Sequence, residues 1–358
     1  MTDAHVPGAV QVLPLPGLPE ITAGTDLAAA LALSLEAAGG LRDGDVLVVS
    51  SKLVSKALGL RVPEPVDRER VVADQSVRVV AERLTPAGLT QVVESVAGPV
   101  LAAGGVDASN TGPEGGLLLL PPDPDAAARE LHDGVVRTLG APVRAALLLT
   151  DTAGRPWRDG QTDLALGASG LRVLDDLRGG RDGDGRPLAV TSRAVADELA
   201  AAADLVKGKA SGTGAALVRG LPDLVLGTPD AGSGPEGPTG ARALVRTGPG
   251  DWFALGHREA LRSALGAPPG TPAARRVGLP SVVPEDERQR AARAVRLALV
   301  GQPEDDVEVC LPDDLADGLS VTAPDPVLAG RVAARLEVAL VAEDLHAGVS
   351  VLSRPPAG

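Results

Sequence analysis

The sequence predicts a mixed fold of helices and strands, of either the α/β or the α+β class. Short apolar runs bounded by turn residues are typical of buried strands. Four such runs are present, at 45–50, 98–103, 143–150 and 215–219. Stretches with the apolar spacing of amphipathic helices lie between them. They cover 26–38, 68–83, 124–139 and 192–205.

The helix predicted at 26–38 is the clearest of these elements. Thr25 is its predicted N-cap, and Gly39 with Gly40 ends it. Residues 221–241 are rich in Gly and Pro and are predicted to form a surface loop. With 358 residues, 44% of them hydrophobic, the chain is long enough to bury one large core or two smaller ones.

A second Gly- and Pro-rich segment, 265–274, is predicted to be a linker. Beyond it, helical patterns at 284–300 and 327–342 flank a short acidic strand at 305–312. We therefore predict two domains, residues 1–268 and residues 269–358. The second would be a small α+β appendage whose role the sequence does not indicate.

Composition and charge exclude several classes of function. The net charge of −13 argues against broad binding to nucleic acid or to an anionic membrane surface. Aromatic residues make up only 1% of the chain, with no Tyr, so there is no platform for stacking bases. No apolar run is long enough to span a membrane and no signal peptide is recognisable, which predicts a cytoplasmic protein. The lone Cys310 and four scattered histidines do not form a zinc-site pattern.

Lysine is almost absent, and its few positions are informative. Of 34 basic residues only four are lysines, and they form two short pairs, Lys52 with Lys56 and Lys207 with Lys209. Where coding bias has replaced most lysines by arginine, the remaining ones are candidates for contacts that suit a compact ammonium, such as phosphate oxygens. The same reasoning singles out Asn110 and Ile21, each the only residue of its type. The alternative is a chance cluster on the surface.

Two polar segments follow apolar runs in the first half of the chain. Ser50–Lys56 is predicted to be a loop at the end of a strand, where α/β proteins place ligand contacts and where Lys and backbone N–H groups can hold phosphates. Gly104–Asn110 offers the Asp107 carboxylate to Mg²⁺ or Mn²⁺ and the Asn110 amide to a ligand. A solvent-exposed helix start and an Asx turn are the corresponding structural alternatives.

Two further segments complete the candidate chemistry. The loop predicted at Asp151–Asp163, directly after the apolar run 143–150, contains Asp151 and Thr152, which suit a divalent metal that bridges phosphates, and Arg155 and Arg158, which suit anionic groups. Asp204–Gly214 combines the second lysine pair with flexible glycines. A solvated loop and lysines that complement a helix dipole are the structural alternatives. Together the four segments describe a site for a metal-bound polyphosphate beside an anionic acceptor, as in phosphoryl transfer or ligation.

These motifs, taken in order, resemble the coenzyme F420:γ-glutamyl ligase family. The resemblance spans roughly residues 10–265. It is carried by Gly17–Ile21, Asp43–Lys56, Ala102–Asn110, Thr150–Asp163, Gly167–Asp176, Val195–Lys209 and Asp251–Leu261.

The resemblance implies an α+β fold in a two-fold homodimer and a GTP-dependent amide ligase. Such an enzyme adds L-glutamate to the lactyl-phosphate carboxylate of the coenzyme F420 precursor through an acyl phosphate, and then adds further γ-linked glutamates. It implies Mg²⁺ or Mn²⁺ and allows K⁺ as an additional ion. Lys52, Arg155 and Arg158 would be catalytic. The metal ligands would be Asp107, Asp151 and Thr152. The nucleotide would be held by Leu18, Pro19, Glu20, Ile21, Ser51, Lys52, Lys56, Asn110, Val206, Lys207, Gly208, Lys209, Ala210, Ser211 and Gly212.

The chain also departs from the family pattern. Residues 271–358 are too short for the flavin-binding domain that two-domain members carry, so no FMN is predicted. Arg181–Leu188 lacks the aromatic and amide residues expected there, and Asp159 replaces an expected Asn. Two alternatives therefore stay open. One is a protein that binds deazaflavin or nucleotide without ligating, and the other is a different metal-dependent acid–amine ligase.

Overall fold

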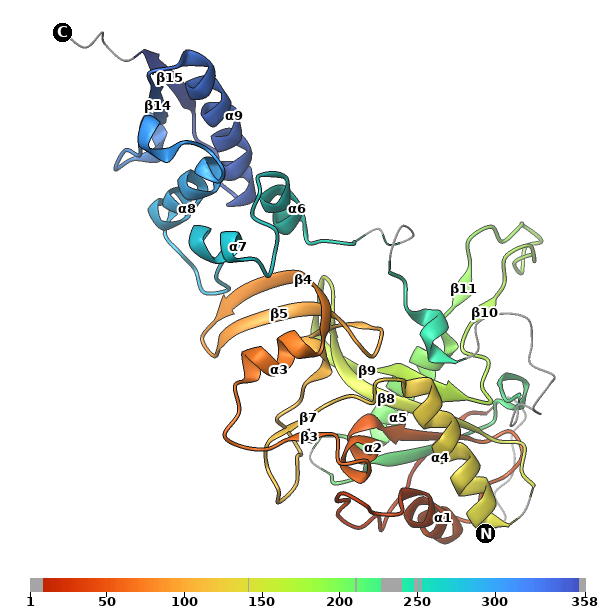
Figure 1. Cartoon of the computed structure of the whole chain (residues 1–358). Coiled ribbons are helices and arrows are strands. Elements are labelled where there is room, and N and C mark those ends of the chain that lie inside the picture. Colours follow the sequence, from red (N-terminus) through yellow and green to blue (C-terminus); the bar gives the residue numbers. More distant parts are fainter. Residues whose placement is uncertain are drawn as a thin grey trace. The chain divides into compact units, whose positions relative to one another are not determined.

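The computed structural model describes residues 9–140, 142–209, 211–226, 240–247, 251 and 253–353 (Figure 1). It divides into two compact units. The first contains the chain up to Gln75 together with Ser95–Arg246, and the second contains Ser76–Glu94 together with the residues from Thr247 onward. The domain boundary predicted after residue 268 falls inside the second unit; as a boundary between domains that fold on their own, it stays a prediction. Helices and mixed sheets confirm the α+β class.

A five-stranded sheet forms the centre of the first unit. Its strands in spatial order are β1 (Gln11–Pro14), β12 (Ala215–Arg219), β2 (Val46–Ser50), β8 (Ala146–Arg155) and β9 (Arg158–Ser169). β2 and β8 are parallel, and the other neighbours are antiparallel. Consequently β1 and β2 stop at the same end of the sheet, where β12 begins, and β8 continues beyond it from Thr150 to Arg155. The predicted strands at 45–50, 143–150 and 215–219 are confirmed, and 98–103 contains β6 (Val100–Ala102).

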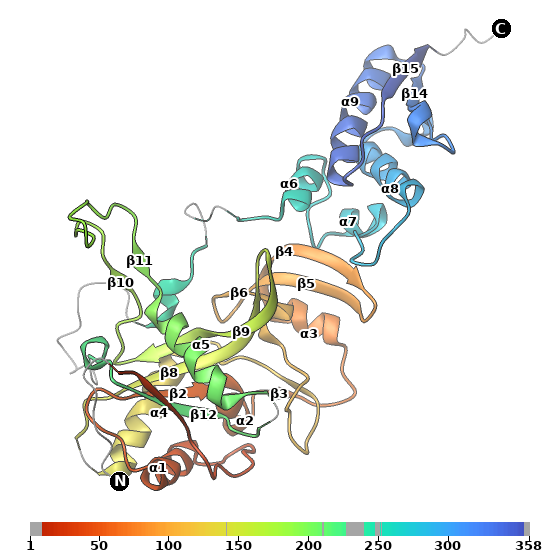
Figure 2. The same cartoon turned by 180° about the vertical axis from the view of Figure 1, so that it is seen from behind.

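Helices cover both faces of this sheet. Odd-numbered strand residues such as Leu47 and Leu147 pack with α1 (Leu27–Ala37), α2 (Ser51–Ala57) and α4 (Pro124–Leu139). Even-numbered ones such as Val48 and Leu148 pack with α5 (Val195–Lys207). Figures 1 and 2 view the sheet from these two sides, with α2 and α4 in front in the first and α5 in front in the second. Burial on both faces explains why the strands are continuous apolar runs.

Several predicted elements need correction. The cap of α1 is Asp26, which accepts a hydrogen bond from the Ala29 N–H, whereas Thr25 accepts one from the Thr22 N–H. The helix predicted at 68–83 ends early: α3 covers Arg68–Asp74, and β4 (Ser76–Thr85) follows. The valines of that second half favour extended backbone, since β-branched side chains pack well on a pleated surface.

The segments expected to be loops after β2 and β8 are regular structure. Ser51–Ala57 forms α2, and the residues after Thr150 continue β8 and return as β9, so that Arg155 pairs with Arg158 across a tight turn. The predicted linker 265–274 also needs correction, because Leu265 and Ala267 are buried in the core of the second unit and α7 begins at Pro272. Of the predicted loop 221–241, residues 227–239 lie outside the described residues.

The first unit contains further short elements. They are β3 (Arg61–Val62), η1 (Ala103–Gly105), β7 (Leu117–Leu118), β10 (Asp175–Asp176), β11 (Ser192–Arg193), η2 (Pro222–Leu224) and η3 (Ala241–Leu244). β3 pairs with β7, and β10 pairs with β11. In the described part of the chain, no helix is both long enough and apolar enough to cross a membrane.

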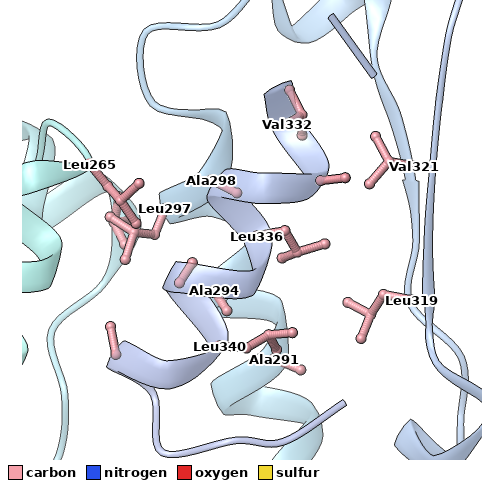
Figure 3. Close-up of a cluster of buried hydrophobic side chains, with 14 of the residues drawn as sticks. Leu265, Ala291, Ala294, Leu297, Ala298, Leu319, Val321, Val332, Leu336 and Leu340 are labelled. Atoms are coloured by element: carbon pink, nitrogen blue, oxygen red, sulfur yellow. The ribbon is translucent and has the colours of Figure 1, made fainter. Parts of the chain in front are cut away.

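The second unit has its own hydrophobic core. Its elements are β4, β5 (Gly88–Ser95), α6 (His257–Ala264), α7 (Pro272–Val277), α8 (Glu287–Leu299), η5 (Glu304–Asp306), β13 (Glu308–Cys310), η6 (Leu315–Asp317), β14 (Leu319–Ala323), α9 (Pro326–Ala342) and β15 (Val349–Ser353). The predicted helices at 284–300 and 327–342 are confirmed as α8 and α9. Figure 3 shows Leu336 and Leu340 of α9 beside Leu319 and Val321 of the sheet.

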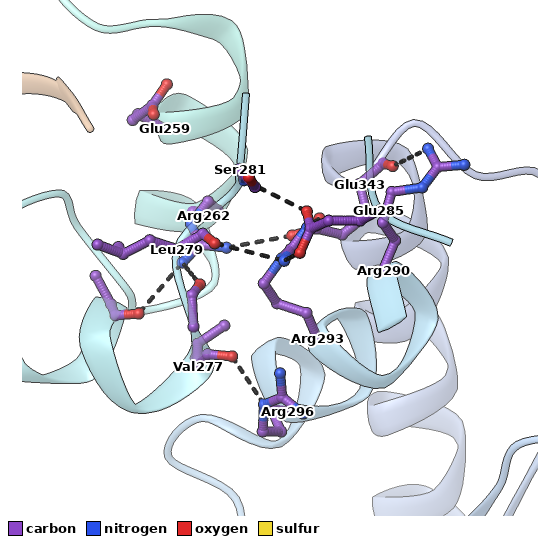
Figure 4. A network of polar contacts seen from close by, with 12 residues as sticks. Glu259, Arg262, Val277, Leu279, Ser281, Glu285, Arg290, Arg293, Arg296 and Glu343 are labelled. Carbon is purple, nitrogen blue, oxygen red and sulfur yellow. Dashed lines mark hydrogen bonds and ion pairs between the residues drawn. The ribbon is translucent and has the colours of Figure 1, made fainter. Parts of the chain in front are cut away.

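A buried ionic network joins the helices of this unit (Figure 4). Glu343, whose side chain is fully buried, accepts hydrogen bonds from Arg262 at 3.2 Å and from Arg293 at 2.6 Å. Arg293 also donates to both carboxylate oxygens of Glu285, at 2.6 and 2.8 Å. Arg262 donates in addition to the Gly278 carbonyl at 2.8 Å. Each buried charge is thus compensated, as burial of ions requires.

We predict that Glu343→Gln destabilises the protein by about 3–5 kcal/mol, because it leaves two buried guanidinium groups without their shared carboxylate. Urea unfolding measured by circular dichroism tests this. The matched control is Glu308→Gln on the exposed surface of β13, which should change stability by no more than about 0.5 kcal/mol. Equal stability of the two variants would contradict the prediction.

The Glu285–Arg293 pair predicts an acid dependence. The hydrogen bonds from Arg293 lower the pKa of Glu285 below its usual 4.5, against the opposing effect of burial. A lowered carboxyl pKa contributes stability that is present above the unfolded pKa and is lost as the pH falls through the folded pKa. Wild type should therefore be more stable than Glu285→Gln at neutral pH, and the difference should shrink below about pH 4.5. Urea midpoints measured from pH 7 to pH 3 check this; a difference independent of pH would refute it.

Candidate active site

A pocket of about 380 Å³ lies at the end of the sheet where β1 and β2 stop, beside Thr152 in the middle of β8. All four lysines of the chain line it, together with its one Asn and its one Ile. The lining residues are Leu18, Pro19, Glu20, Ile21, Ser50, Lys52, Leu53, Lys56, Asn110, Gly112, Thr152, Asp163, Asp204, Lys207, Gly208, Lys209, Gly212, Thr213 and Gly214. In a chain of charge −13, the rare ammonium groups are gathered at one place.

Strand alternation distributes the polar groups of β8 over both faces of the sheet. Successive side chains of a strand point to opposite faces. Asp151 therefore lies on the α2 face, where it meets Lys52, and Thr150 and Thr152 lie on the α5 face, where Thr150 meets Lys207. A β-bulge opposite Leu149 and Thr150 adjusts the register with β9, so that Thr152 stands opposite Asp163.

On the α2 face, two carboxylates converge on one ammonium. Lys52 Nζ lies 2.5 Å from Asp107 Oδ2 and 3.9 Å from Asp151 Oδ1. Burial alone would lower the pKa of Lys52, but the hydrogen bond to Asp107 and the charges of both carboxylates outweigh it, and the pKa is raised. Burial likewise opposes ionisation of Asp107, yet the Lys52 contact keeps its pKa below the usual value.

Asp151 is the least compensated charge of the site. Its side chain is 10% exposed, and burial raises its pKa to about 6 despite the nearby Lys52 charge. The neighbouring Asp107 charge adds to this rise. A buried carboxylate with so little compensation fits a position that receives a further cation.

On the α5 face, Asp163 accepts three hydrogen bonds. Lys207 Nζ donates to Oδ2 at 2.5 Å, Thr150 Oγ1 donates to Oδ2 at 2.7 Å, and Thr152 Oγ1 donates to Oδ1 at 2.8 Å. Both members of the ion pair are nearly inaccessible, with side chains 4% and 5% exposed. Burial would raise the pKa of Asp163, but the Lys207 charge and the three donors lower it. The hydroxyl of Thr152 keeps its lone pairs for another ligand because its proton points to Asp163.

Arg61 of β3 holds the loop that carries Asp107 and Asn110. It donates to the Thr111 carbonyl at 2.6 Å and to the Gly115 carbonyl, and its Nε lies 3.1 Å from Glu114 Oε2. The Asn110 side chain in turn donates to the Lys209 carbonyl at 3.4 Å. This contact joins the loop to the segment after α5.

The same loop closely approaches the Lys56–Glu20 pair, whose charged atoms are 2.6 Å apart. Gly112 has φ +79°, and a Cβ there would lie 2.5 Å from Glu20 Oε1 and 3.3 Å from Lys56 Nζ. Only glycine combines this backbone conformation with so close an approach.

The structure brings together most of the residues predicted to hold the nucleotide. Of that set, Leu18, Pro19, Glu20, Ile21, Lys52, Lys56, Asn110, Lys207, Gly208, Lys209 and Gly212 line the pocket. Ser51, Val206 and Ser211 do not line it, although the Ser51 Oγ is buried and has no hydrogen-bond partner among the described residues. Ala210 lies outside the described residues. The roles of all these residues stay predictions.

The two arginines predicted to be catalytic are not among the residues that line the pocket. Arg155 and Arg158 lie at the tip of the β8–β9 hairpin and are not among the lining residues. Arg155 donates to the Asp159 carbonyl at 3.2 Å within that tip. Sequence reasoning placed them near Asp151 because it treated the segment as a compact loop, whereas an extended hairpin carries them away.

Asp163 and Asp204 are the acidic lining residues to which the sequence analysis assigned no role. Burial and the Asp163 charge raise the pKa of Asp204. A prediction of the hairpin would have revealed Asp163, because pairing β8 with β9 sets it opposite Thr152. Asp204 lies one helical turn before Lys207 on α5. The helical spacing would therefore have placed Asp204 on the same side of the helix as Lys207.

The predicted metal ligands fit a hard divalent cation by their chemistry. Among the described residues, no group of three or more His, Cys, Asp or Glu side chains has a metal-binding arrangement. The predicted set has two carboxylates, Asp107 and Asp151, which meet at Lys52 on the α2 face, whereas the hydroxyl of its third member, Thr152, lies on the α5 face and donates to Asp163. Mg²⁺ commonly takes one or two protein carboxylates and completes its shell with phosphate oxygens and water.

Comparison with known proteins gives a consistent result. The model of the family described as F420-0:Gamma-glutamyl ligase matches residues 17–220, which include every residue that lines the pocket. A protein of Methanopyrus kandleri named Coenzyme F420:L-glutamate ligase is 38% identical over 260 residues, covering 68% of this chain and 97% of that protein. Proteins of the same name from Natronomonas pharaonis and Halorubrum lacusprofundi are 41% and 36% identical over 230 and 222 residues, covering 59% and 57% of this chain and 86% and 84% of theirs.

We predict strong coupling between Asp163 and Lys207. Either Asp163→Asn or Lys207→Met alone leaves one buried charge without its partner and should cost about 3–5 kcal/mol of stability. The double variant should be more stable than the sum of the two losses implies, since it removes both charges. Urea unfolding of the four proteins measures this coupling; additive losses would contradict the prediction.

Proposed function

The chain belongs to the F420-0:Gamma-glutamyl ligase family, and from this membership we propose that it is a coenzyme F420:L-glutamate ligase that uses GTP and a divalent cation. The reaction joins the lactyl-phosphate carboxylate of the coenzyme F420 precursor to the amine of L-glutamate. GTP is converted to GDP and phosphate. Further γ-linked glutamates would be added by the same chemistry, and the working form would be a homodimer.

One observation carries this proposal: the only four lysines of the chain line one pocket beside two carboxylates that share an ammonium. A nucleotide triphosphate brings several negative charges, and compact ammonium groups neutralise phosphate oxygens well. The carboxylates would be unfavourable for such a ligand unless a divalent cation lay between them and the phosphates. A site with both features therefore suits a metal-bound nucleotide better than a simple anion.

We assign roles by matching the family motifs to this geometry. The phosphates would be neutralised by two pairs of lysines. Lys52 and Lys56 come from α2, and Lys207 and Lys209 come from the end of α5 and the segment directly after it. The rest of the nucleotide would be held by Leu18–Ile21, Ser51, Asn110 and the segment 206–212. Asp107 and Asp151, which share the α2 face, would hold Mg²⁺ or Mn²⁺, with K⁺ as an additional ion; Thr152, the third predicted ligand, has its hydroxyl on the α5 face. When bound, the divalent cation would supply charge neutralisation for phosphoryl transfer.

The order of bond changes follows from the reactants. A carboxylate is a poor acceptor for an amine, so it first takes the γ-phosphoryl group of GTP and becomes an acyl phosphate, with GDP as the leaving group. The glutamate amine then attacks the acyl carbon, the amide bond forms, the bond to phosphate breaks and the ammonium proton is lost. Lys52 and Lys207 would stabilise the charge that develops on the transferred oxygens.

Water must be kept from the acyl phosphate, because hydrolysis would waste the GTP. The apolar side chains of Leu18, Ile21 and Leu53 line the pocket beside the lysines. We propose that they limit water at the reacting carbon once the substrates fill the volume.

We predict that Asp151→Ala abolishes turnover while the fold stays intact, since it removes a metal ligand and relieves a poorly compensated buried charge. Asp159→Ala, an exposed substitution at the tip of the same hairpin, should keep activity within about twofold of wild type. GDP release and circular dichroism measure the two properties. Full activity of a folded Asp151→Ala protein would refute the metal assignment.

A mass-spectrometric assay tests the proposed reaction directly. The purified chain is incubated with the glutamate-free deazaflavin, L-glutamate, GTP and Mn²⁺. One matched sample lacks the metal, and another contains ATP in place of GTP. The expected result is a mass gain of one or more glutamates together with GDP, only in the sample with GTP and metal. GDP without glutamylated product would indicate a different acid acceptor. Binding of the deazaflavin without any turnover would indicate a non-catalytic binding protein.

A further inference from the structure

Helix α9 of the second unit has two distinct faces. Its inner face packs into the core of that unit, and Figure 3 shows Val332, Leu336 and Leu340 on this side. The outer face still carries apolar side chains. Val327 is 75% exposed, Val341 58% and Val338 38%.

The outer face has an internal symmetry about Ala334. Arg331 and Glu337 lie three residues before and after it, Gly330 and Val338 four residues, and Val327 and Val341 seven residues. All seven positions are exposed. They repeat at the spacing of a helix–helix seam, in which every seventh residue returns to the same side.

The charges on this face lack intrahelical partners. No residue of opposite charge stands three or four positions from Arg331 or from Glu337 on α9, which are the separations at which helical side chains meet. Among the ion pairs of the described residues, none contains Arg331 or Glu337. The two charges are therefore available to a partner.

Placed antiparallel against a second copy, the face is complementary to itself. A two-fold axis at Ala334 sets Arg331 of each copy against Glu337 of the other and Val327 against Val341 of the other. In an isologous interface each contact occurs twice, so one sequence supplies both halves. The small residues at 330 and 334 allow the two helices to approach closely at the crossing.

We propose that the outer face of α9 is an interaction surface for a second copy of this chain, which binds antiparallel about a two-fold axis at Ala334. A pair of single helices buries less than the roughly 1,200–2,000 Å² of a stable interface. The association therefore depends on concentration unless other contacts between the copies add to it.

Cysteine cross-linking of the full chain tests the geometry. The native Cys310 is exposed and is first replaced in a Cys310→Ser background. Ala334→Cys should then form a disulfide between copies under mild oxidation, because residue 334 meets itself at the axis. Val327→Cys alone should not, since its two copies would be about 21 Å apart along the helices. Mixing Val327→Cys with Val341→Cys protein should give the mixed disulfide dimer.

A charge exchange tests the chemistry independently. Arg331→Glu places like charges opposite each other twice and should weaken self-association by roughly tenfold or more, as should Glu337→Arg. The double variant Arg331→Glu/Glu337→Arg restores both pairs and should recover it. Sedimentation equilibrium measures these changes; the association step that the charge reversals weaken is the one through α9, which separates it from the homodimer of the proposed function, and none of these residues belongs to the pocket.

The possible outcomes decide the proposal. Failure of Ala334→Cys to cross-link, or equal cross-linking of Val327→Cys alone, would overturn it. Association that the single charge reversals leave unchanged would do the same, and would mean that the copies meet elsewhere or that another part of the same chain covers α9. These measurements do not depend on turnover, so their outcome is independent of whether the proposed ligase activity is confirmed.

Discussion

The ion pair between Asp163 and Lys207 is the contact on which the geometry of the pocket depends. It ties β9 to the end of α5, and through the two threonine hydroxyls it also fixes β8. Burying these charges is unfavourable unless every hydrogen-bonding position is satisfied. The three donors to Asp163 meet that requirement. The segment after Lys207, which carries Lys209, then leaves the helix at a fixed place beside the pocket.

The second determinant is the direction of the strands. Because β1 and β2 end at the same end of the sheet and β8 passes it at Thr150, the segments after β1 and β2 meet the middle of β8 there, although they are far apart in the sequence. Alternation along β8 then separates a carboxylate directed to Lys52 from hydroxyls directed to Asp163. Two ammonium-bearing elements on opposite faces of one sheet can thereby act on the same ligand.

The sequence predicted the buried strands, α1, α4, the family and the residues that gather at the pocket, because each leaves a local signal. Rarity was the most useful signal: the four lysines, Asn110 and Ile21 stood out from a biased composition and all line one pocket. It did not predict β4 or the β8–β9 hairpin, since a short amphipathic run fits a helix or a strand equally well. Arg155 was therefore expected beside Asp151, and Asp163 was not assigned. Their positions depend on strand pairing, which is not a local property.

The pairing of Lys52 with two carboxylates has a consequence for chemical selectivity. The acyl phosphate of the proposed reaction would be an acylating agent, and the ε-amino groups around the pocket would be nucleophiles that compete with the glutamate amine. Only an unprotonated amine has the lone pair needed for attack. Because Asp107 and Asp151 raise the pKa of Lys52, that side chain stays an ammonium. In the proposed reaction the carboxylates would thus protect the enzyme from acylating itself and would leave the positive charge in place for the phosphates.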